Sequence, residues 1–219
     1  TAQEVEQSQQ KHGQRPIARM DRLGLINDRL IAVHMTQLTE AEIHLCAERG
    51  VSVVHCPESN LTLASGFCPA CALQRAGVNL AIGTDGVASN NDLDMFGETR
   101  TAAILAKAVA NDAAGFDAFS ALRAATLGGA KAMGFDHLVG SIEPGKQADL
   151  ACVDLSALET QPLHHVVSQL IYATGRQQVS DVWIAGKSKL SARVLVDMDM
   201  DGIIANAKQW RGRIAAIGR

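Results

Sequence analysis

Three short apolar runs, each ending in a polar residue, alternate with amphipathic segments over the first half of the chain. The runs cover 29–34, 51–55 and 78–85, and the segments after them predict helices over 39–50, 69–75 and 93–109. Thr39 and Glu42 form a capping-box signature at the start of the first of these helices. Before the first run, residues 2–25 are helix-like, with a break at Gly13 and a new start at Pro16. Apolar strands that alternate with helices pair in parallel, so we expect consecutive β-α units and an α/β fold.

The pattern changes in the second half of the chain. An Ala-rich helix is predicted over 116–133, and a glycine-containing turn follows at 140–146. Beyond this turn the pattern predicts strands over 148–154 and 179–184, with a short helix over 166–172 between them. The final predicted helix covers 201–217, and its apolar positions at near-helical spacing are interpreted as a packing stripe. We therefore expect a second, β-rich module from about residue 138.

The composition is that of an ordinary globular protein. The chain has 219 residues, of which 47% are hydrophobic, and a formal net charge of −3. It contains no long run of cations and no apolar stretch of about 18 residues, which argues against nucleic-acid-binding and membrane proteins. We expect a small-molecule partner, no nucleic acid and no membrane. Five cysteines in a chain that needs no disulfides, together with the polar opening segment, favour a cytoplasmic location.

Three side chains that can bind a metal stand at the ends of the three predicted strands: His34, His55 and Asp85. In α/β folds the chemistry lies at the carboxyl ends of the strands. A lone histidine there is more often a hydrogen-bonded polar residue, but three such residues in register on successive strands favour a functional site. An Asp beside two His can complete a mononuclear site for a divalent metal, in which bound water becomes hydroxide near neutral pH.

Longer motifs surround these three residues. The chain reads HCPESN at 55–60, LASG at 63–66, GTDG at 83–86, ASNNDLDM at 88–95 and GSIEPGKQADL at 140–150. Together the motifs resemble the amidohydrolase superfamily and, within it, the 5-methylthioadenosine/S-adenosylhomocysteine deaminase group. The same branch contains s-triazine chlorohydrolases and guanine deaminases. The motifs cover nearly the whole chain and identify the superfamily more firmly than the substrate.

The resemblance implies a distorted (β/α)8 TIM barrel with a small β-sandwich domain. Residues 1–137 would form the C-terminal part of the barrel, with strands six to eight. Residues 138–195 would form a segment of the β-sandwich, and residues 196–219 a C-terminal helix. The resemblance also implies one divalent metal ion, zinc or another such as iron or manganese.

The resemblance also assigns roles to the three strand-end residues. Asp85 matches the metal ligand of the eighth strand, which takes a proton from water. His34 matches the sixth-strand histidine that contacts the metal-bound hydroxide and the reacting centre of the substrate. His34 and Asp85 are therefore the expected catalytic residues, and His34 also contacts the substrate. His55 matches a position of the seventh strand that lines the substrate pocket.

Ser59, Asn60 and Asn90 are further candidates for substrate binding, because they lie in the motifs beside the strand ends. Asn91 and Glu98, close to Asn90, are candidates for shaping the pocket. For each residue alone, hydrogen bonding within a loop or capping of a helix is the alternative, and it is the commoner role for such residues. Both interpretations stay open at this point.

Cys68 and Cys71 have the spacing of a redox or zinc pair. No second pair follows them, and the start of a helix at Pro69 accounts for the spacing. They are predicted to be buried or inert thiols.

Part of the family's metal site has no counterpart in the sequence. The family holds its metal with a His-x-His on the first strand and a fifth-strand histidine, followed by a Glu that shuttles protons, and neither motif is present. A barrel also needs eight strands and roughly 250 residues, whereas residues 1–137 offer three predicted strands. We therefore expect the C-terminal portion of a longer enzyme, with the N-terminal remainder of the same enzyme as its partner. The resemblance also allows a homodimer.

The implied function is hydrolytic deamination of adenosine-like thioethers, namely 5-methylthioadenosine and S-adenosylhomocysteine. Metal-bound hydroxide would attack the carbon that bears the amino group, and ammonia would leave. One alternative is another hydrolase of the same branch, an s-triazine chlorohydrolase or a guanine deaminase. The other alternative is a non-catalytic fragment that acts as a binding or scaffold module.

Overall fold

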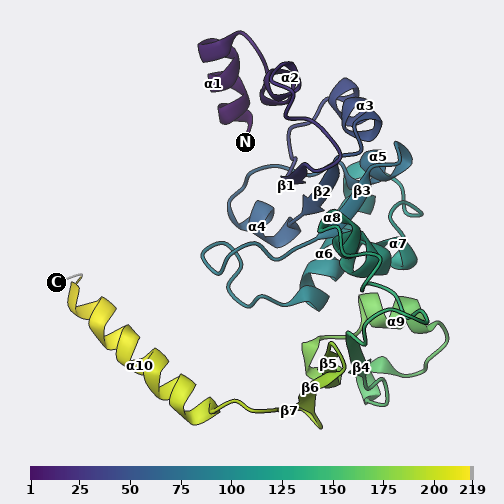
Figure 1. Cartoon of the computed structure of the whole chain (residues 1–219), viewed down its shortest axis with the longest axis vertical. Coiled ribbons are helices and arrows are strands. Elements are labelled where there is room, and N and C mark those ends of the chain that lie inside the picture. Colours follow the sequence, from purple (N-terminus) through teal and green to yellow (C-terminus); the bar gives the residue numbers. More distant parts are fainter. Residues whose placement is uncertain (218–219) are drawn as a thin grey trace.

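The computed structural model describes residues 1–217 and contains two β-sheets, of which the first is packed against helices (Figure 1). The first sheet is parallel and contains β1 (Ile31–Val33), β2 (Ser52–His55) and β3 (Asn79–Ile82) in that order. In its register Ala32 lies beside Val53, which lies beside Leu80. The predicted α/β fold with three consecutive β-α units is confirmed. Among the described residues, no further strand pairs with the outer edges of β1 and β3.

Helices pack around this parallel sheet and enclose one apolar core. Two helices precede β1, and others follow each strand: α1 (Ala2–His12), α2 (Pro16–Arg22), α3 (Glu40–Glu48), α4 (Pro57–Thr62), α5 (Ala70–Arg75) and α6 (Met95–Ala110). Buried side chains from strands, such as Val53, meet those from helices, such as Ile43 and Leu73. Both hydrogen bonds of the predicted capping box between Thr39 and Glu42 are formed. The side chains of β2 and β3 are therefore mostly buried, whereas Ile31 and Val33 of β1 are exposed.

Helix α4 is a correction to the prediction, which has a loop between β2 and residue 69. The helix begins at Pro57, whose fixed φ and missing N–H suit the first turn of a helix. With six residues, it is too short to show an apolar repeat in the sequence. The correction matters because α4 carries Ser59 and Asn60.

The predicted helix over 116–133 is divided into three parts. Helix α7 (Ala118–Arg123) continues through the π-helical turn η1 (Ala124–Gly128) into α8 (Gly129–Ala132). At Gly128 a Cβ atom would collide with the carbonyl oxygen of Leu80 in β3. Only glycine allows the helix to approach the strand so closely.

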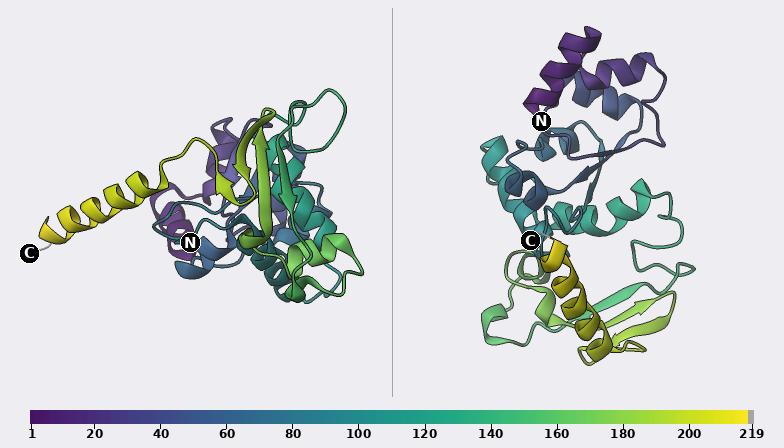
Figure 2. Two further views of the ribbon diagram at one scale, coloured as in Figure 1. Left: turned by 90° about the horizontal axis from the view of Figure 1, so that it is seen from below. Right: turned by 90° about the vertical axis from the view of Figure 1, so that its left-hand side faces the viewer.

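The second sheet is antiparallel and contains β4 (Leu150–Val153), β5 (Val179–Ile184), β6 (Lys187–Ser191) and β7 (Val194–Leu195) in that order. Between β4 and β5 lie the 3-10 turns η2 (Leu158–Thr160) and η3 (Arg176–Gln178) and the helix α9 (Val166–Tyr172). Helix α9 packs on α6 and α7, and its Ile171 belongs to the main core. In space, this second sheet and α9 lie together at one end of the molecule (Figure 2). The β-rich character of this segment is confirmed, while its boundary near residue 138 stays a prediction.

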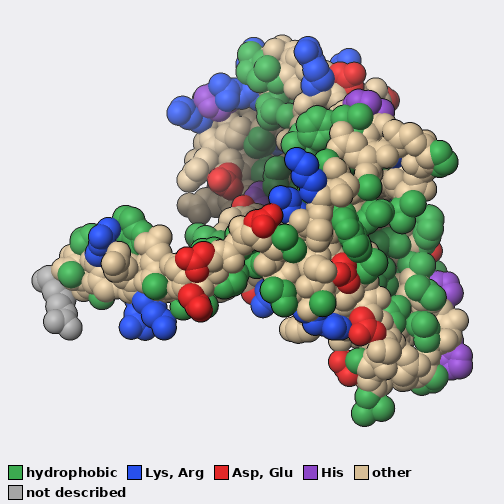
Figure 3. Space-filling view, turned by 60° about the horizontal axis from the view of Figure 1, so that its bottom comes forward, with side chains coloured by type: hydrophobic (Ala, Val, Ile, Leu, Met, Phe, Trp, Pro, Cys, Tyr) green, Lys and Arg blue, Asp and Glu red, His purple; other side chains and the backbone are tan. Residues whose placement is uncertain are grey.

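Helix α10 (Met200–Ile217) extends away from the rest of the chain as a separate arm (Figures 1 and 3). None of its residues is buried, and Ile203, Trp210 and Ile214 are each about half exposed or more. The predicted packing stripe is therefore not packed within residues 1–217, because the connection after β7 leads the helix away from both sheets. Residues 218 and 219 of the predicted C-terminal segment lie outside the described residues. No helix in the described part of the chain is long and apolar enough to cross a membrane.

Candidate active site

His34 follows β1 directly and is held in place from both its backbone and its ring. Its backbone N–H donates to the carbonyl oxygen of Val54 at 3.0 Å, which extends the pairing of β1 with β2. Its φ of 71° is in the left-handed region. Its ring Nδ1 lies 2.8 Å from Oδ1 of Asn60 in α4. Because Nδ1 is occupied by this hydrogen bond, Nε2 is the ring nitrogen that remains for chemistry.

Asp85 lies three residues beyond β3 and is also left-handed, with a φ of 63°. Its Oδ2 accepts hydrogen bonds from Oγ of Ser59 at 2.7 Å and from Oγ of Ser89 at 3.1 Å, and its Oδ1 accepts one from the Gly86 N–H at 2.7 Å. The hydrogen bond from Ser59, followed by that from Gly86, holds the pKa of Asp85 below its ordinary value. Asp85 is therefore an oriented, ionised carboxylate at neutral pH.

The two predicted catalytic side chains come together at the carboxyl end of the sheet. Nε2 of His34 lies 3.7 Å from Oδ2 of Asp85. Their side chains are 41% and 36% exposed, so both are open to a ligand. The predicted convergence of His34 and Asp85 on one edge of the sheet is confirmed. The catalytic role of the pair stays a prediction.

His55 ends β2 and is almost completely enclosed, at 2% exposure. Within residues 1–217, neither of its ring nitrogens has a hydrogen-bond partner. Burial, followed by the charge of nearby His34, lowers the pKa of His55 to about 4. His55 is therefore neutral at physiological pH, and its predicted place in the wall of a substrate pocket stays a prediction.

The remaining predicted residues make hydrogen bonds inside the site. Ser59 and Asn60 are buried and contact Asp85 and His34, respectively. Asn90 is also buried: its Nδ2 donates to Oε1 of Glu98 at 3.0 Å, and its Oδ1 accepts from the Leu93 N–H at 2.9 Å. These hydrogen bonds fit the alternative to substrate binding, in which the three residues hold the neighbouring side chains and loop in place. Direct contact with a substrate stays a prediction for all three.

Ser89 is a site residue that the predictions do not include. It donates to Asp85, and its Oγ lies 2.8 Å from Oγ of Ser59, so it belongs to the same group of oxygens. A signal for it exists in the sequence, because Ser89 stands one turn after Asp85 and just before Asn90. The turn itself is tight, since the N–H groups of Ser89 and Asn90 both donate to the Gly86 carbonyl oxygen.

The donor set fits part of a divalent metal site. Within residues 1–217, no three His, Cys, Asp or Glu side chains come together in a way that could hold a metal ion. Asp85 Oδ1 accepts a single hydrogen bond and keeps a free lone pair, and His34 Nε2 lies 3.7 Å from the other oxygen, Oδ2. Zinc takes four ligands in most protein sites. The described residues thus offer one carboxylate ligand and a neighbouring imidazole, and further ligands must come from elsewhere.

Four of the five cysteines are buried, and all five are free thiols in the structure. Burial raises the pKa of Cys68 to about 12 and also raises that of Cys71. Cys68 and Cys71 are therefore buried, protonated thiols, as predicted, and they take no part in a redox or zinc site among residues 1–217.

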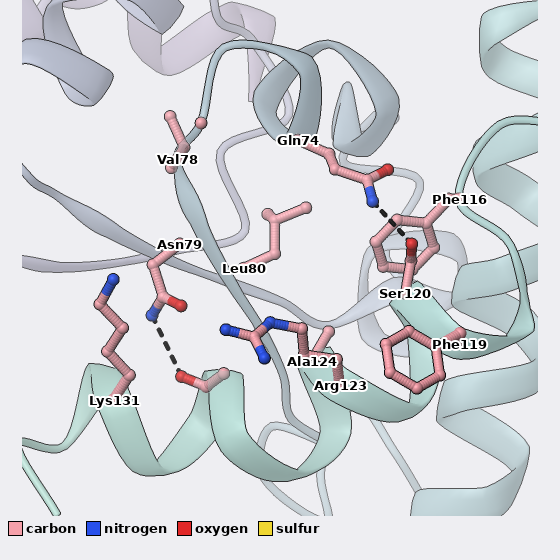
Figure 4. A pocket seen from close by; sticks show the side chains of 12 residues that line it. Gln74, Val78, Asn79, Leu80, Phe116, Phe119, Ser120, Arg123, Ala124 and Lys131 are labelled. Carbon is pink, nitrogen blue, oxygen red and sulfur yellow. Dashed lines mark hydrogen bonds between the residues drawn. The ribbon is translucent and has the colours of Figure 1, made fainter. Parts of the chain in front are cut away.

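A hollow of about 270 Å³ lies at the other end of β3, against the helix that contains Gly128 (Figure 4). Gln74 and Ser120 bond to each other across it, and Asn79 donates to the Gly128 carbonyl oxygen. Its lining contains no His, Cys, Asp or Glu. The hollow therefore has none of the side chains that usually bind zinc.

Comparisons with known proteins agree with this arrangement. The model of the Amidohydrolase family matches residues 1–189. A 5-methylthioadenosine/S-adenosylhomocysteine deaminase of Teredinibacter turnerae is 49% identical over 99% of this chain and 49% of its own length. The protein of the same name from Saccharophagus degradans is 44% identical over 99% of this chain and 48% of its own length.

Solved structures give the same result. An adenosine deaminase of Xanthomonas campestris with bound zinc matches with a TM-score of 0.98 and 79% identity, over 99% of this chain and 49% of its own. An atrazine chlorohydrolase of Arthrobacter aurescens complexed with zinc matches with a TM-score of 0.88 and 26% identity, over 94% of this chain and 46% of its own. The chain spans about half the length of the relatives it matches. The sequence match and the fold together show that this chain belongs to the amidohydrolase family.

Proposed function

We propose that this chain is the carboxyl-terminal half of a zinc-dependent deaminase that hydrolyses 5-methylthioadenosine and S-adenosylhomocysteine. The observation that carries the proposal is the pair formed by His34 Nε2 and Asp85 Oδ2, 3.7 Å apart at the carboxyl end of a parallel sheet. The substrate class is supported by relatives of that name at 49% and 44% identity over 99% of the chain. Zinc is supported by the 79% identical neighbour, which holds that ion.

The proposal includes the architecture of the whole enzyme. Strands β1, β2 and β3 would be strands six, seven and eight of a (β/α)8 barrel, and β4–β7 a segment of the small β-sandwich. In residues 1–217 neither outer edge of the parallel sheet pairs with another strand, which supports this arrangement because a barrel closes by pairing both edges. The preceding half of the enzyme would supply the other strands, the remaining metal ligands and the acid that protonates the purine ring.

The reaction replaces one C–N bond by one C–O bond. Bound zinc would act as a Lewis acid and lower the pKa of water. Asp85 would ligate the ion and accept a proton from the attacking water. Asn60 would hold the His34 ring, whose Nε2 would donate to the negative charge that develops on the oxygen bonded to the reacting carbon. One proton of water then leaves with ammonia, and the other stays on the ring nitrogen.

The proposal places the substrate, a small molecule, against His34, with His55, Ser59, Asn60 and Asn90 around it. Of these, His34 is the most open side chain, and the other four are buried. A cytoplasmic location is part of the proposal, supported by the free thiols of all five cysteines.

The test uses the protein expressed from its complete reading frame and loaded with zinc. Ammonia release is measured from 5-methylthioadenosine, S-adenosylhomocysteine and guanine, and chloride release from atrazine. We expect the two thioethers to have the highest kcat/KM, and a His34→Asn variant to be inactive on both. Faster reaction with guanine or atrazine would assign another substrate, and no turnover of any compound by a zinc-loaded protein would contradict an enzymatic function.

A further inference from the structure

Glu98 is an ionisable residue for which the proposed chemistry has no use. It lies in the first turn of α6 and is completely buried, at 0% exposure. No ion pair of Glu98 occurs in the described part of the chain. A buried carboxyl group without a cation is unfavourable unless hydrogen bonds satisfy it. Its hydrogen bonds therefore indicate what it does.

Its two oxygens bind two different segments. Oε2 accepts from the backbone N–H of Glu58 at 3.0 Å, in the first turn of α4. Oε1 accepts from Nδ2 of Asn90 at 3.0 Å, at the end of the tight turn that begins at Gly86. One carboxyl group thus joins a helix and a loop that are otherwise separate in the sequence.

Both segments carry side chains that hold the catalytic pair. Ser59 and Asn60 follow Glu58 in α4 and contact Asp85 and His34. Ser89 precedes Asn90 and contacts Asp85. A shift of either segment would therefore move a hydrogen-bond partner of the pair.

Capping of α6 does not explain Glu98. Asp94 is the N-cap of α6 and accepts from the Phe96 N–H at 2.9 Å. Glu98 is directed instead to α4, which packs against α6. At Gly97 a Cβ atom would lie 3.4 Å from Oε1 of Glu58, which is an ordinary van der Waals contact between the two helices.

We propose that Glu98 is a positioning residue, whose carboxyl group holds the first turn of α4 to the loop that follows Asp85. It thereby fixes the position of Ser89, a hydrogen-bond donor of Asp85, relative to Ser59 and Asn60 in α4. This inference rests on the proposed function for its kinetic consequences, whereas its structural consequences are independent of the substrate.

The test variant is Glu98→Gln, which keeps the shape of the side chain but can accept only one of the two hydrogen bonds. We expect kcat for the thioethers to fall about 10- to 100-fold with an unchanged zinc content, because small displacements near reacting groups have effects of this size. The matched control is Glu42→Gln, which alters another buried carboxylate, bound to Arg15 and the Thr39 N–H. The control should lower Tm and keep kcat within about twofold.

A second measurement does not depend on activity. In hydrogen–deuterium exchange of the zinc-loaded protein, Glu98→Gln should speed exchange in both 57–62 and 86–94, and Glu42→Gln in neither. Unchanged exchange in both segments, or a fall in kcat fully explained by lost zinc, would overturn the proposal. If the wild type releases no ammonia, the proposed function fails, but exchange still decides the role of Glu98.

A variant at Asn90 provides a further check. Should Glu98→Gln fail to fold, Asn90→Ala removes one of the two bonds, and faster exchange in 86–94 alone would support the inference. Unchanged exchange in Asn90→Ala would overturn it.

Discussion

Two buried glutamates, one in the outer helix layer and one at the carboxyl end of the parallel sheet, have opposite surroundings. Glu42, at the start of α3, binds Arg15 through a bond of 2.8 Å and accepts from the Thr39 N–H at 2.9 Å. Burial raises the pKa of Glu42, but the bonds from Arg15 and Thr39 outweigh burial and leave it below the ordinary value. Glu98 has neutral donors only, and burial raises its pKa to about 7.

The difference shows how the two regions are stabilised. The outer layer pairs a buried charge with a cation, which fixes a helix to its neighbour and stabilises the fold. At the carboxyl end of the sheet, polar side chains instead form hydrogen bonds with one another, as Ser59 does with Asp85 and Asn60 with His34. Side chains in that region keep lone pairs for a ligand. Variants in the two regions should therefore have different consequences.

The largest effect is expected from Asp85→Ala. The variant removes the only carboxylate of the site that is open to a metal in residues 1–217, so both zinc and activity should be lost, with kcat reduced by at least about 1,000-fold. Zinc per chain is measured by mass spectrometry of the dialysed protein. Asp92→Ala, which alters an exposed acid of the same loop, is the control and should keep its zinc. Zinc retained in Asp85→Ala would show that Asp85 is not a ligand.

His34→Ala should be almost as damaging to turnover but should not remove the metal. Loss of a hydrogen-bond donor to the developing negative charge lowers kcat by about 100- to 1,000-fold. Steady-state kinetics and zinc analysis measure the two effects on the same preparation. His44→Ala, at an exposed position of α3, should change neither. If His34→Ala lost its zinc, His34 would have to be counted among the ligands.

Asn60→Ala distinguishes the two roles that remain open for Asn60. If Asn60 positions the His34 ring, kcat should fall about fivefold with little change in KM, because one hydrogen bond is worth about 1 kcal/mol. If Asn60 binds the substrate directly, KM should rise instead. Initial-rate measurements over a range of thioether concentrations separate these outcomes.

The smallest effects concern stability, and they should have opposite signs for the two glutamates. The pKa of Glu98 is raised from 4.5 to about 7, so its contribution to stability is fully present below pH 4.5 and is lost as the pH rises through 7. The pKa of Glu42 is lowered, so its contribution is present above 4.5 and is lost as the pH falls through its folded-state value.

Urea unfolding of the wild type, Glu98→Gln and Glu42→Gln between pH 4 and 8 measures this contrast. The stability of the wild type relative to Glu98→Gln should fall by ~3 kcal/mol from the acidic to the alkaline end. Its stability relative to Glu42→Gln should fall only toward the acidic end. If the stability difference between wild type and variant had the same pH dependence for both variants, the two glutamates would not differ as proposed.

The parallel sheet could be predicted because its strands are recognisable one at a time. Each apolar run is long enough to indicate a strand, and the polar residue after it marks the end where chemistry occurs. That reasoning was sufficient to bring His34 and Asp85 together from residues 51 positions apart. The apolar positions of α10 also indicated a helix, but periodicity cannot tell whether a partner for its face is present.

The polar contacts of the site could not be predicted in the same way. Ser59 and Asp85 are 26 positions apart, as are His34 and Asn60, and no local pattern connects such pairs. Glu98 is harder still, since an acid in the first turn of a helix is common for reasons of the helix dipole alone. Only the packing of α4 against α6 shows which donors it binds.

The left-handed backbone at His34 and Asp85 lowers the stability of the fold at two positions whose side chains the proposed reaction needs. Glycine adopts positive φ more readily than any other residue, by about 1 kcal/mol. Glycine at position 34 or 85 would therefore relax the main chain while it removes a reacting group. Directed evolution that selects this protein for heat tolerance alone would drift toward inactive sequences at these two positions, so such a library needs a simultaneous selection for turnover.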